Sequence, residues 1–352
     1  MRMLKVWWHI LTSAGTGMRA GRQSDQLFRY YVFKTLEDLG FFHFIRQPRS
    51  YGEILANFGF VDGPYTREVI DTLANDKNNV IQNNDEEYSI NPEVDRPTLD
   101  QVLTRTDRRI RPFVMMAEGM SHNILDRLQA ENIGFAEVME REEYELLSKF
   151  DTVLGSQIYT SMRSAAFAYL GKENFEWLRG KHLLDSGCGS GRETAEIWLK
   201  FNGEIKITAI DPVPSMIELA HETFESYLDQ LDPEHPPVTD ANRPIFRVGS
   251  ATQLEFPDNS FDACFWLFIL HWASDPRKVI HEATRVVRPG GLIFGAQPFK
   301  PEANPYFNLV IRSSRNSHGF FWREEYHHWW SEVGLRIDLA TPAGMFRAIN
   351  TP

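Results

Sequence analysis

Cysteine and long apolar runs are both scarce in this chain. Only two of its 352 residues are cysteines, Cys188 and Cys264, so a disulfide framework like that of small secreted domains is not expected. No stretch approaches the roughly 18 uninterrupted apolar residues that a membrane helix needs. The apolar patch at the start is interrupted by His9, is followed by no clear cleavage site, and is interpreted as a first helix. These absences predict a protein of the reducing cytoplasm with no membrane partner.

Positive charge is also in short supply. The chain has 37 Lys and Arg against 48 Asp and Glu, a net charge of −11 at pH 7. Such a field repels phosphates unless a local basic patch overrides it. The densest basic run, residues 105–111, is typical of a solvated linker or helix face. Nucleic acid is therefore not an expected partner.

Histidines at metal-binding spacing are lacking as well. His327 and His328 are adjacent in a helix-compatible stretch, so their side chains point in different directions and cannot chelate one ion. No separated cluster of ligands accompanies them, and no metal is predicted.

A glycine-rich stretch at residues 182–191 is the most informative feature that is present. A short apolar run ends at Asp185, ahead of the glycines and a helix-compatible stretch. The glycines follow at alternate positions, Gly187, Gly189 and Gly191. This order predicts a buried strand, a tight turn and a helix start, which present backbone N–H groups to a ligand. Arg192 stands where the fingerprint G-x-G-x-x-G needs its third glycine, so a dinucleotide is not indicated. A glycine-rich turn without a ligand is the alternative.

A second strand is predicted over residues 204–210, which are rich in β-branched side chains. It ends at Asp211, 20 residues after Gly191. An acid at the tip of the second strand of a nucleotide-type fold hydrogen-bonds a ribose diol. A simple helix-start residue before Pro212 is the alternative interpretation of Asp211.

Two further stretches have recognisable patterns. The residues after Asp211 begin a helix in the order D-x-x-x-x-M-x-x-x-A, completed by Met216 and Ala220. Residues 285–291 read Arg-Val-Val-Arg-Pro-Gly-Gly, which predicts an amphipathic helix stopped by Pro289 and turned into another buried strand.

Together these motifs resemble the class I S-adenosylmethionine-dependent methyltransferases, in particular their type 11 subgroup. The resemblance covers about residues 175–350. It implies an α/β fold with a doubly wound, seven-stranded, mostly parallel Rossmann-like sheet and helices on both faces. It also implies S-adenosylmethionine as the cofactor, bound at the carboxyl ends of the strands.

The resemblance further implies which residues contact the cofactor. Those at strand ends and in loops are Asp185, Gly187, Cys188, Gly189, Gly191, Asp211, Pro212, Met216, Ser250 and Ala251. Tyr159 and Arg163 approach the cofactor from a helical stretch earlier in the chain. The alternative interpretation is that both residues only pack within an amphipathic helix. Ser250 departs from the Asp that the family usually carries. Adenine recognition is therefore expected to be weaker, or to rest on the neighbouring backbone.

The N-terminal half is predicted to be mainly helical. The expected elements are a helix over 25–42 ended by Gly40, short helices over 50–58 and 66–75, and a hairpin over 80–90. This order is a winged-helix pattern, which makes a DNA-binding regulator the rival interpretation. Residues 1–100 have 11 Lys and Arg against 14 Asp and Glu, and the middle short helix is not basic. Both observations argue against phosphate binding.

A winged helix ahead of such a sheet resembles the small-molecule O-methyltransferases, whose N-terminal domain dimerises and helps to close the active site. A homodimer is therefore expected. The predicted domains are a winged-helix-like domain over 1–110, a helical connector and substrate-chamber wall over 111–174, and the cofactor-binding domain over 175–352.

His271 is the candidate general base. It follows the predicted fourth strand at the active-site edge of the sheet, where natural-product O-methyltransferases carry a catalytic histidine in L-H-D-W-x-D. This chain reads Leu-His-Trp-Ala-Ser-Asp from Leu270 to Asp275, so the Asp after the histidine is absent. A positioned base contributes about 10²–10⁴-fold in rate. A structural or substrate-contact histidine is the alternative.

Residues 298–321 are long for a connector and leave the predicted fifth strand on the substrate side. Long ordered loops at such a place are usually lids. Tyr306, Asn308 and Arg312 in this segment are predicted to help set acceptor specificity.

The sequence thus predicts a methyltransferase that acts on a small molecule. A hydroxyl of an aromatic compound or secondary metabolite is the expected acceptor, with N- or C-methylation left open. No N-P-P-Y-type element follows the fourth strand, which argues against methylation of nucleic-acid amino groups or glutamine. The alternatives are a non-catalytic cofactor-binding or winged-helix regulatory protein, and an enzyme of the same fold with non-methyl chemistry.

Overall fold

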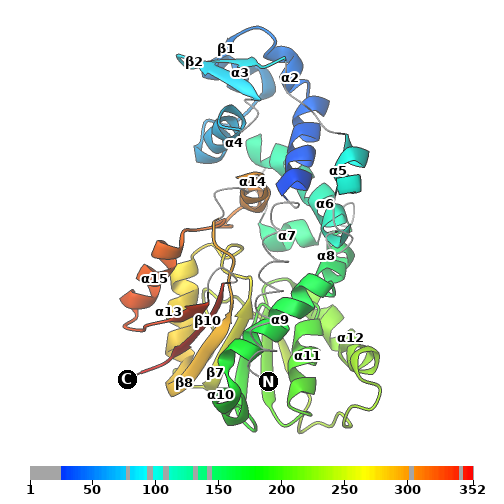
Figure 1. Ribbon diagram of the computed structural model, residues 1–352, viewed down its shortest axis with the longest axis vertical. Helices are drawn as coiled ribbons and strands as arrows, with labels where there is room; N and C mark the ends of the chain where they lie inside the picture. The colour runs from blue at the N-terminus through cyan, green and yellow to red at the C-terminus, as the bar shows by residue number, and fades with distance from the viewer. Residues whose placement is uncertain are drawn as a thin grey trace. The chain divides into compact units, whose positions relative to one another are not determined.

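The computed structural model describes residues 25–76, 80–92, 98–105, 111–129, 134–140, 145–300, 305–340 and 344–351 (Figure 1). The expected first helix near residue 9 lies outside these residues. The described residues form two compact units. One unit contains those within 147–300 and 320–351, and the other contains those within 25–146 and 305–319. These boundaries differ from the three predicted ranges.

The first unit is built on a seven-stranded sheet in the order β6-β5-β4-β7-β8-β10-β9. The strands are β4 (His182–Ser186), β5 (Lys206–Asp211), β6 (Ile245–Val248), β7 (Phe261–Leu267), β8 (Val287–Ala296), β9 (Asp338–Ala340) and β10 (Met345–Ile349). All neighbouring pairs are parallel except those of β10, which runs antiparallel to β8 and β9. The predicted doubly wound, mostly parallel sheet is confirmed, and the strand order reverses beside β4.

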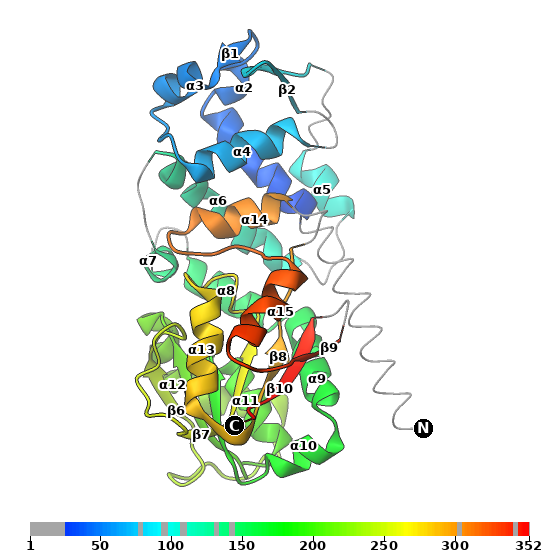
Figure 2. The ribbon, with the colours of Figure 1, turned by 90° about the vertical axis from the view of Figure 1, so that its left-hand side faces the viewer.

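Helices cover both faces of this sheet (Figures 1 and 2). They are α9 (Gln157–Leu170), α10 (Lys172–Trp177), α11 (Arg192–Lys200), α12 (Pro214–Leu231), α13 (Pro276–Val286) and α15 (Arg323–Glu332). Helix α8 (Leu146–Leu154) precedes α9 along the chain. Helices α9, α11 and α12 contribute to one hydrophobic core, and α13 and α15 contribute to the other. Helix α9 packs on the sheet and lies in the same unit as the sheet.

Alternation along the strands explains the two cores. In β7, Ala263 and Phe265 face one core while Cys264 and Trp266 face the other. A strand covered on both faces needs apolar side chains at successive positions, which is why β7 is nearly continuously apolar. Cys188 lies in the core opposite that of Cys264, and both thiols are free.

The turn into β8 differs in detail from the prediction. Helix α13 ends at Val286, three residues before Pro289, and β8 already begins at Val287. The register between β7 and β8 shifts in this region, where Gly290 has a φ of 80°. The proline and glycines therefore form an irregularity within the strand instead of a separate turn.

The second unit is mainly helical. Its described elements are the helical residues 25–38, α2 (Phe41–Phe44), β1 (Arg49–Ser50), α3 (Tyr51–Phe58), α4 (Pro64–Ala74), β2 (Ile81–Asn84), β3 (Glu87–Ile90), α5 (Leu99–Arg105), α6 (Arg111–Leu128), α7 (Phe135–Met139) and α14 (Pro305–Ser313). The predicted helices and hairpin are present. Gly40 adopts the left-handed conformation at the end of the first helix. The hairpin turns at Asp85 and Glu86, both with positive φ, so its loop is two residues long.

Membrane-crossing helices are absent from the described part of the chain, where none is both long and apolar enough to span a bilayer.

Candidate functional site

The glycine loop joins β4 to α11 and donates its hydrogen bonds to the protein itself. The N–H groups of Gly187 and Cys188 both donate to the carbonyl oxygen of Ile210 in β5, at 2.7 and 2.9 Å. The N–H of Gly189 donates to Asp211 Oδ2 at 3.0 Å, and that of Gly191 donates to the Cys188 carbonyl at 3.1 Å. The prediction that the loop presents its N–H groups to a ligand is wrong for these four. The loop is consequently not a phosphate cradle.

Glycine is needed in this loop because other segments lie directly on it. Gly187 and Gly189 have φ values of 80° and 54°. A Cβ on Gly187 would lie 2.4 Å from Ile269, which follows β7, and one on Gly189 would lie 2.6 Å from Leu154 of α8. The loop is thus held between α8 and the chain that leaves β7.

Asp211 lies at the end of β5, beside the loop. Its two carboxylate oxygens accept hydrogen bonds from the N–H groups of Gly189 and Val213, each at 3.0 Å. The side chain is buried, and this burial raises the pKa of Asp211 to about 6. An ionised carboxylate has about four lone-pair sites, so Asp211 can accept two more hydrogen bonds. A diol fits this requirement.

Asp185 and Glu193 form an acidic pair, at the end of β4 and the start of α11. Asp185 Oδ2 accepts a hydrogen bond from Thr194 Oγ1 at 2.6 Å. Asp185 Oδ1 and Glu193 Oε1 are buried without a donor among the described residues. Burial raises the pKa of Asp185 to about 6 and the pKa of Glu193 well above its usual value. A proton shared by the two carboxyls satisfies both oxygens and leaves one negative charge, which suits a cationic ligand.

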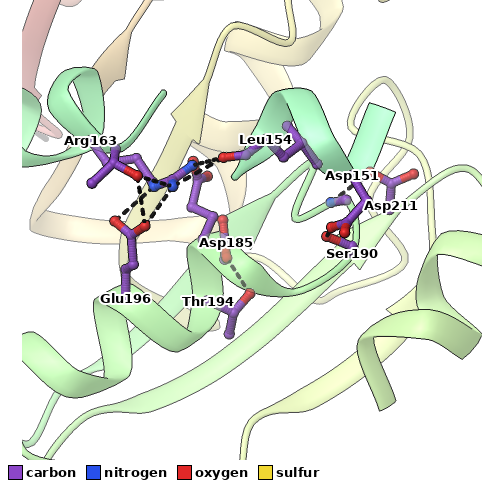
Figure 3. Close-up of polar contacts among 11 residues, drawn as sticks. Asp151, Leu154, Arg163, Asp185, Ser190, Thr194, Glu196 and Asp211 are labelled. Atoms are coloured by element: carbon purple, nitrogen blue, oxygen red, sulfur yellow. Dashed lines mark hydrogen bonds and ion pairs between the residues drawn. The ribbon is translucent and has the colours of Figure 1, made fainter. Parts of the chain in front are cut away.

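Arg163 of α9 ties the elements around the loop together (Figure 3). Its Nε and Nη2 donate to the two carboxylate oxygens of Glu196 in α11, at 2.9 and 2.5 Å. Its Nη1 donates to the carbonyl of Leu154 at 3.1 Å and lies 4.0 Å from Glu193. The guanidinium is 1% exposed. Because its donors are directed at protein acceptors, Arg163 supports the loop, and its predicted contact with the cofactor stays a prediction.

Asp151 of α8 is a second support that the sequence did not indicate. It accepts a hydrogen bond from Ser190 in the loop (Figure 3). It accepts another from Tyr227 of α12 at 2.9 Å. No local motif marks Asp151, which precedes Ser190 by 39 residues. Glu193 and Glu196, by contrast, stand within the first turns of the helix that the motif predicts, and their spacing was a signal that could have been used.

The other predicted cofactor residues lie at the same edge of the sheet. Met216 is buried in the first turn of α12, whereas Pro212 is exposed. The N–H of Gly249 donates to the backbone carbonyl of Asp211 at 3.0 Å, which brings Ser250 and Ala251 beside the end of β5. The Ser250 hydroxyl forms a hydrogen bond with the Thr252 hydroxyl, with the two oxygens 2.8 Å apart.

Tyr159 of α9 lies beside the segment that follows β7. Its ring makes an edge contact with Phe268, with centroids 5.5 Å apart. Phe268 has a φ of 61°, which is uncommon for a bulky residue and is typical of functional turns. Its N–H donates to Ala296 at 3.0 Å, and this turn places Ile269 on the loop.

His271 follows the same turn and is buried. Its ring packs against Phe320 and Trp272, with centroids 4.9 and 5.3 Å apart. Its Nδ1 lies 3.2 Å from Nε2 of Gln297, the residue after β8. Burial lowers the pKa of His271 to about 3, so the imidazole is neutral at physiological pH. A base that is so weak is poorly matched to proton abstraction near neutral pH.

The segment predicted as a lid belongs to the helical unit. Tyr306 donates to Asp76, Asn308 donates to Glu68 at 2.9 Å, and Arg312 pairs with Glu68 at 2.5 Å. The apolar residues of α14 are buried against the same unit, which explains why it does not remain a loop. The influence of these three side chains on acceptor choice stays a prediction.

His327 and His328 are both exposed on α15, and His328 lies 3.3 Å from Glu332. No group of three or more histidine, cysteine or carboxylate side chains suited to a metal ion occurs in the described part of the chain.

Residues 184–295 match the family model described as a methyltransferase domain. A malonyl-[acyl-carrier protein] O-methyltransferase of Serratia marcescens is 31% identical over 114 residues, 32% of this chain and 37% of that protein. A 27-O-demethylrifamycin SV methyltransferase of Amycolatopsis mediterranei is 33% identical over 112 residues, 32% of this chain and 36% of that protein. The chain thus spans just over a third of the length of these relatives.

Solved structures share the fold over most of the chain. The CurJ carbon methyltransferase matches with a TM-score of 0.74 and 13% identity, over 99% of this chain and 97% of that one. An O-methyltransferase family protein from Burkholderia thailandensis matches with a TM-score of 0.54 and 16% identity, over 93% and 95%. The fold is that of the class I methyltransferases. Residues 184–295, which match the methyltransferase-domain model, lie within this fold.

Proposed function

We propose that this protein transfers a methyl group from S-adenosylmethionine to a small-molecule acceptor, expected to be a hydroxyl of an aromatic compound or secondary metabolite. The observation that carries the proposal is the arrangement of carboxylates around the glycine loop. Asp211 has hydrogen-bonding capacity for a diol, and the pair Asp185 and Glu193 favours a positive charge. The loop's own N–H groups are engaged by the protein, which disfavours a phosphate ligand.

The residues present fit S-adenosylmethionine. When bound, this cofactor supplies a methyl group on an already activated sulfur, so the protein has mainly to align the acceptor and to exclude water. Asp211 would hold the ribose diol, and Met216, Ser250 and Ala251 would lie on the adenine side. Ser250 offers no charge, and its hydroxyl is already paired with Thr252.

Calorimetry with S-adenosylmethionine and S-adenosylhomocysteine tests the cofactor. A panel of phenols, hydroxy acids and enols, incubated with the protein and S-adenosylmethionine, tests the activity by mass spectrometry for a gain of one methyl group. Binding without turnover of any acceptor would favour a non-catalytic cofactor-binding protein. Absence of binding would contradict the proposal.

Cofactor affinity is expected to fall as the pH falls below about 6. Burial holds the pKa of both Asp185 and Asp211 near 6, and their ionised forms are the ones that attract a cation and accept hydroxyl hydrogen bonds. For each carboxylate that must be ionised, the dissociation constant for S-adenosylmethionine should rise about fivefold between pH 6 and pH 5. Asp211→Asn should flatten this dependence. Equal affinity at pH 5 and pH 7 would contradict the assignment.

We also propose that the protein is a cytoplasmic homodimer whose N-terminal unit is a winged helix that does not bind nucleic acid. The order of its helices and its three-stranded sheet supports the winged helix. Helix α4 carries both acidic and basic side chains, and its Glu68 pairs with Arg312 of α14. Both observations disfavour α4 as a phosphate-binding surface. Light scattering of the purified protein tests the dimer, and retention of duplex DNA at moderate salt would contradict the last point.

A further inference from the structure

The side-chain amide of Gln297 has only one orientation that its surroundings accept. Gln297 is fully buried directly after β8. Its Oε1 accepts a hydrogen bond from the N–H of Leu270 at 3.2 Å, while its Nε2 donates to the carbonyl of Pro298 at 3.1 Å. A backbone N–H needs an acceptor and a carbonyl needs a donor, so exchanging the two ends of the amide would break both hydrogen bonds.

The orientation of this amide decides where His271 keeps its proton. The second N–H of Gln297 Nε2 faces His271 Nδ1 at 3.2 Å. Nδ1 must therefore offer a lone pair, and a neutral imidazole then has its proton on Nε2. Protonation of Nδ1 would set two N–H groups against each other. Among the described residues, none makes a hydrogen bond to His271 Nε2.

The place of His271 connects it with the proposed reaction. It lies two residues after Ile269, whose side chain covers Gly187 of the loop. A general base at this site would need a bare Nε2 and a proton on Nδ1, which is the opposite tautomer. The same ring with Nε2–H is instead a neutral hydrogen-bond donor.

We propose that Gln297 is a positioning residue that holds His271 as the Nε2–H tautomer, so that His271 donates a hydrogen bond to an acceptor oxygen and abstracts no proton. This inference rests on the proposed methyl transfer. It also names the substrate class, because an acceptor that receives no help from a base must ionise by itself. Acidic phenols, carboxylic acids and enols of 1,3-dicarbonyl compounds meet this requirement.

The proton balance of the step is simple. The acceptor loses its proton to water before transfer and enters as an oxyanion or enolate. The new bond to the methyl carbon forms with the acceptor's electron pair as the bond between methyl and sulfur breaks. His271 keeps its proton throughout and stabilises the anion through Nε2–H, as donors in oxyanion holes do.

Nitrogen NMR of the full chain with ¹⁵N-labelled histidine rings tests the tautomer without any substrate. The signals of His271 are those that disappear in His271→Gln. We expect a neutral ring with its proton on Nε2 from pH 5 to pH 8. A proton on Nδ1, or titration of this ring near pH 6.5, would overturn the proposal. This measurement needs neither cofactor nor acceptor. A wrong tautomer would therefore contradict the present proposal alone, whereas failure of the proposed function would appear in the calorimetry.

Variants of Gln297 provide a matched pair for the same measurement. Gln297→Glu places a carboxylate opposite Nδ1, and we expect the proton to move to Nδ1 and the pKa of the ring to rise. Gln297→Met keeps the size of the side chain but removes both amide groups, so the ring should lose its preference for one tautomer. An unchanged Nε2–H tautomer in a folded Gln297→Met protein would show that Gln297 does not set it.

Turnover separates a donor from a base. The side-chain amide of glutamine can donate a hydrogen bond but cannot act as a base, so His271→Gln should keep kcat/KM within about tenfold of the native protein. His271→Ala should lose about 10²-fold or more. With 4-nitrophenol and 4-methylphenol as probes, the more acidic 4-nitrophenol should be methylated faster at pH 7. Equal losses in both variants, faster methylation of 4-methylphenol, or methylation of neither phenol would count against the proposal.

Discussion

Asp211→Ala is expected to weaken binding of S-adenosylhomocysteine by at least about a hundredfold. Two hydrogen bonds from a diol to a charged carboxylate contribute about 1.5–3 kcal/mol each, and about 1.4 kcal/mol corresponds to a tenfold change in affinity. The loss should exceed that sum, because the N–H groups of Gly189 and Val213 lose their acceptor at the same time. Isothermal calorimetry measures the affinity directly.

A matched control for this experiment is Glu222→Ala. Glu222 is an exposed acid on α12, the helix that follows Asp211, and its removal changes the net charge by the same amount. We expect it to leave the affinity within about twofold of the native value, as for screened surface charges. If Asp211→Ala bound as well as Glu222→Ala, the assignment of Asp211 to the ribose would be wrong.

Arg163→Met is expected to lower the free energy of unfolding by about 3–5 kcal/mol, the usual consequence of removing one partner of a buried ion pair. Arg163 is 1% exposed and pairs with Glu196, which is 9% exposed. Without the guanidinium, Glu196 would stay buried without its cation, and the carbonyl of Leu154 would lose two hydrogen bonds. The end of α8 would then be detached from α9, and the loop would lose part of its support.

The same substitution at a surface ion pair provides the control. Arg179 is 37% exposed and pairs with Glu176 and Glu204, so Arg179→Met should leave the free energy of unfolding nearly unchanged. The midpoint and slope of urea unfolding give both values. In the double variant Arg163→Met with Glu196→Gln, part of the loss should be recovered, because the buried charge is also removed. A loss in Arg163→Met no larger than that in Arg179→Met would contradict the role of Arg163 as a buried support.

Local patterns predicted the sheet unit well. The apolar runs and the glycine loop predicted β4 and the start of α11, and the β-branched run before Asp211 predicted β5. Each of these features is visible in residues that are close together in the sequence. A strand that is covered on both faces, for example, must be apolar at successive positions. The turn at Pro289 was predicted less accurately, since its place inside β8 depends on pairing with β7.

Contacts between distant segments could not be predicted in the same way. Arg163 and Glu196 are separated by 33 residues, Asp151 and Ser190 by 39, and Tyr306 and Asp76 by 230. Each pair is brought together only by packing, and the charged or polar partner shows no periodic pattern in its own segment. For this reason α14 was interpreted as a lid, although its hydrogen bonds and apolar face hold it to the helical unit.

The sequence by itself determined the class of fold and the positions of the acidic and glycine residues around the loop. These follow from hydrophobic periodicity and from backbone conformations that only glycine adopts readily. Only the tertiary structure decided where the loop's N–H groups point, what Arg163 binds and which nitrogen of His271 keeps the proton. Each of these depends on a donor or acceptor from another strand or helix, and only the folded chain sets their separation and orientation.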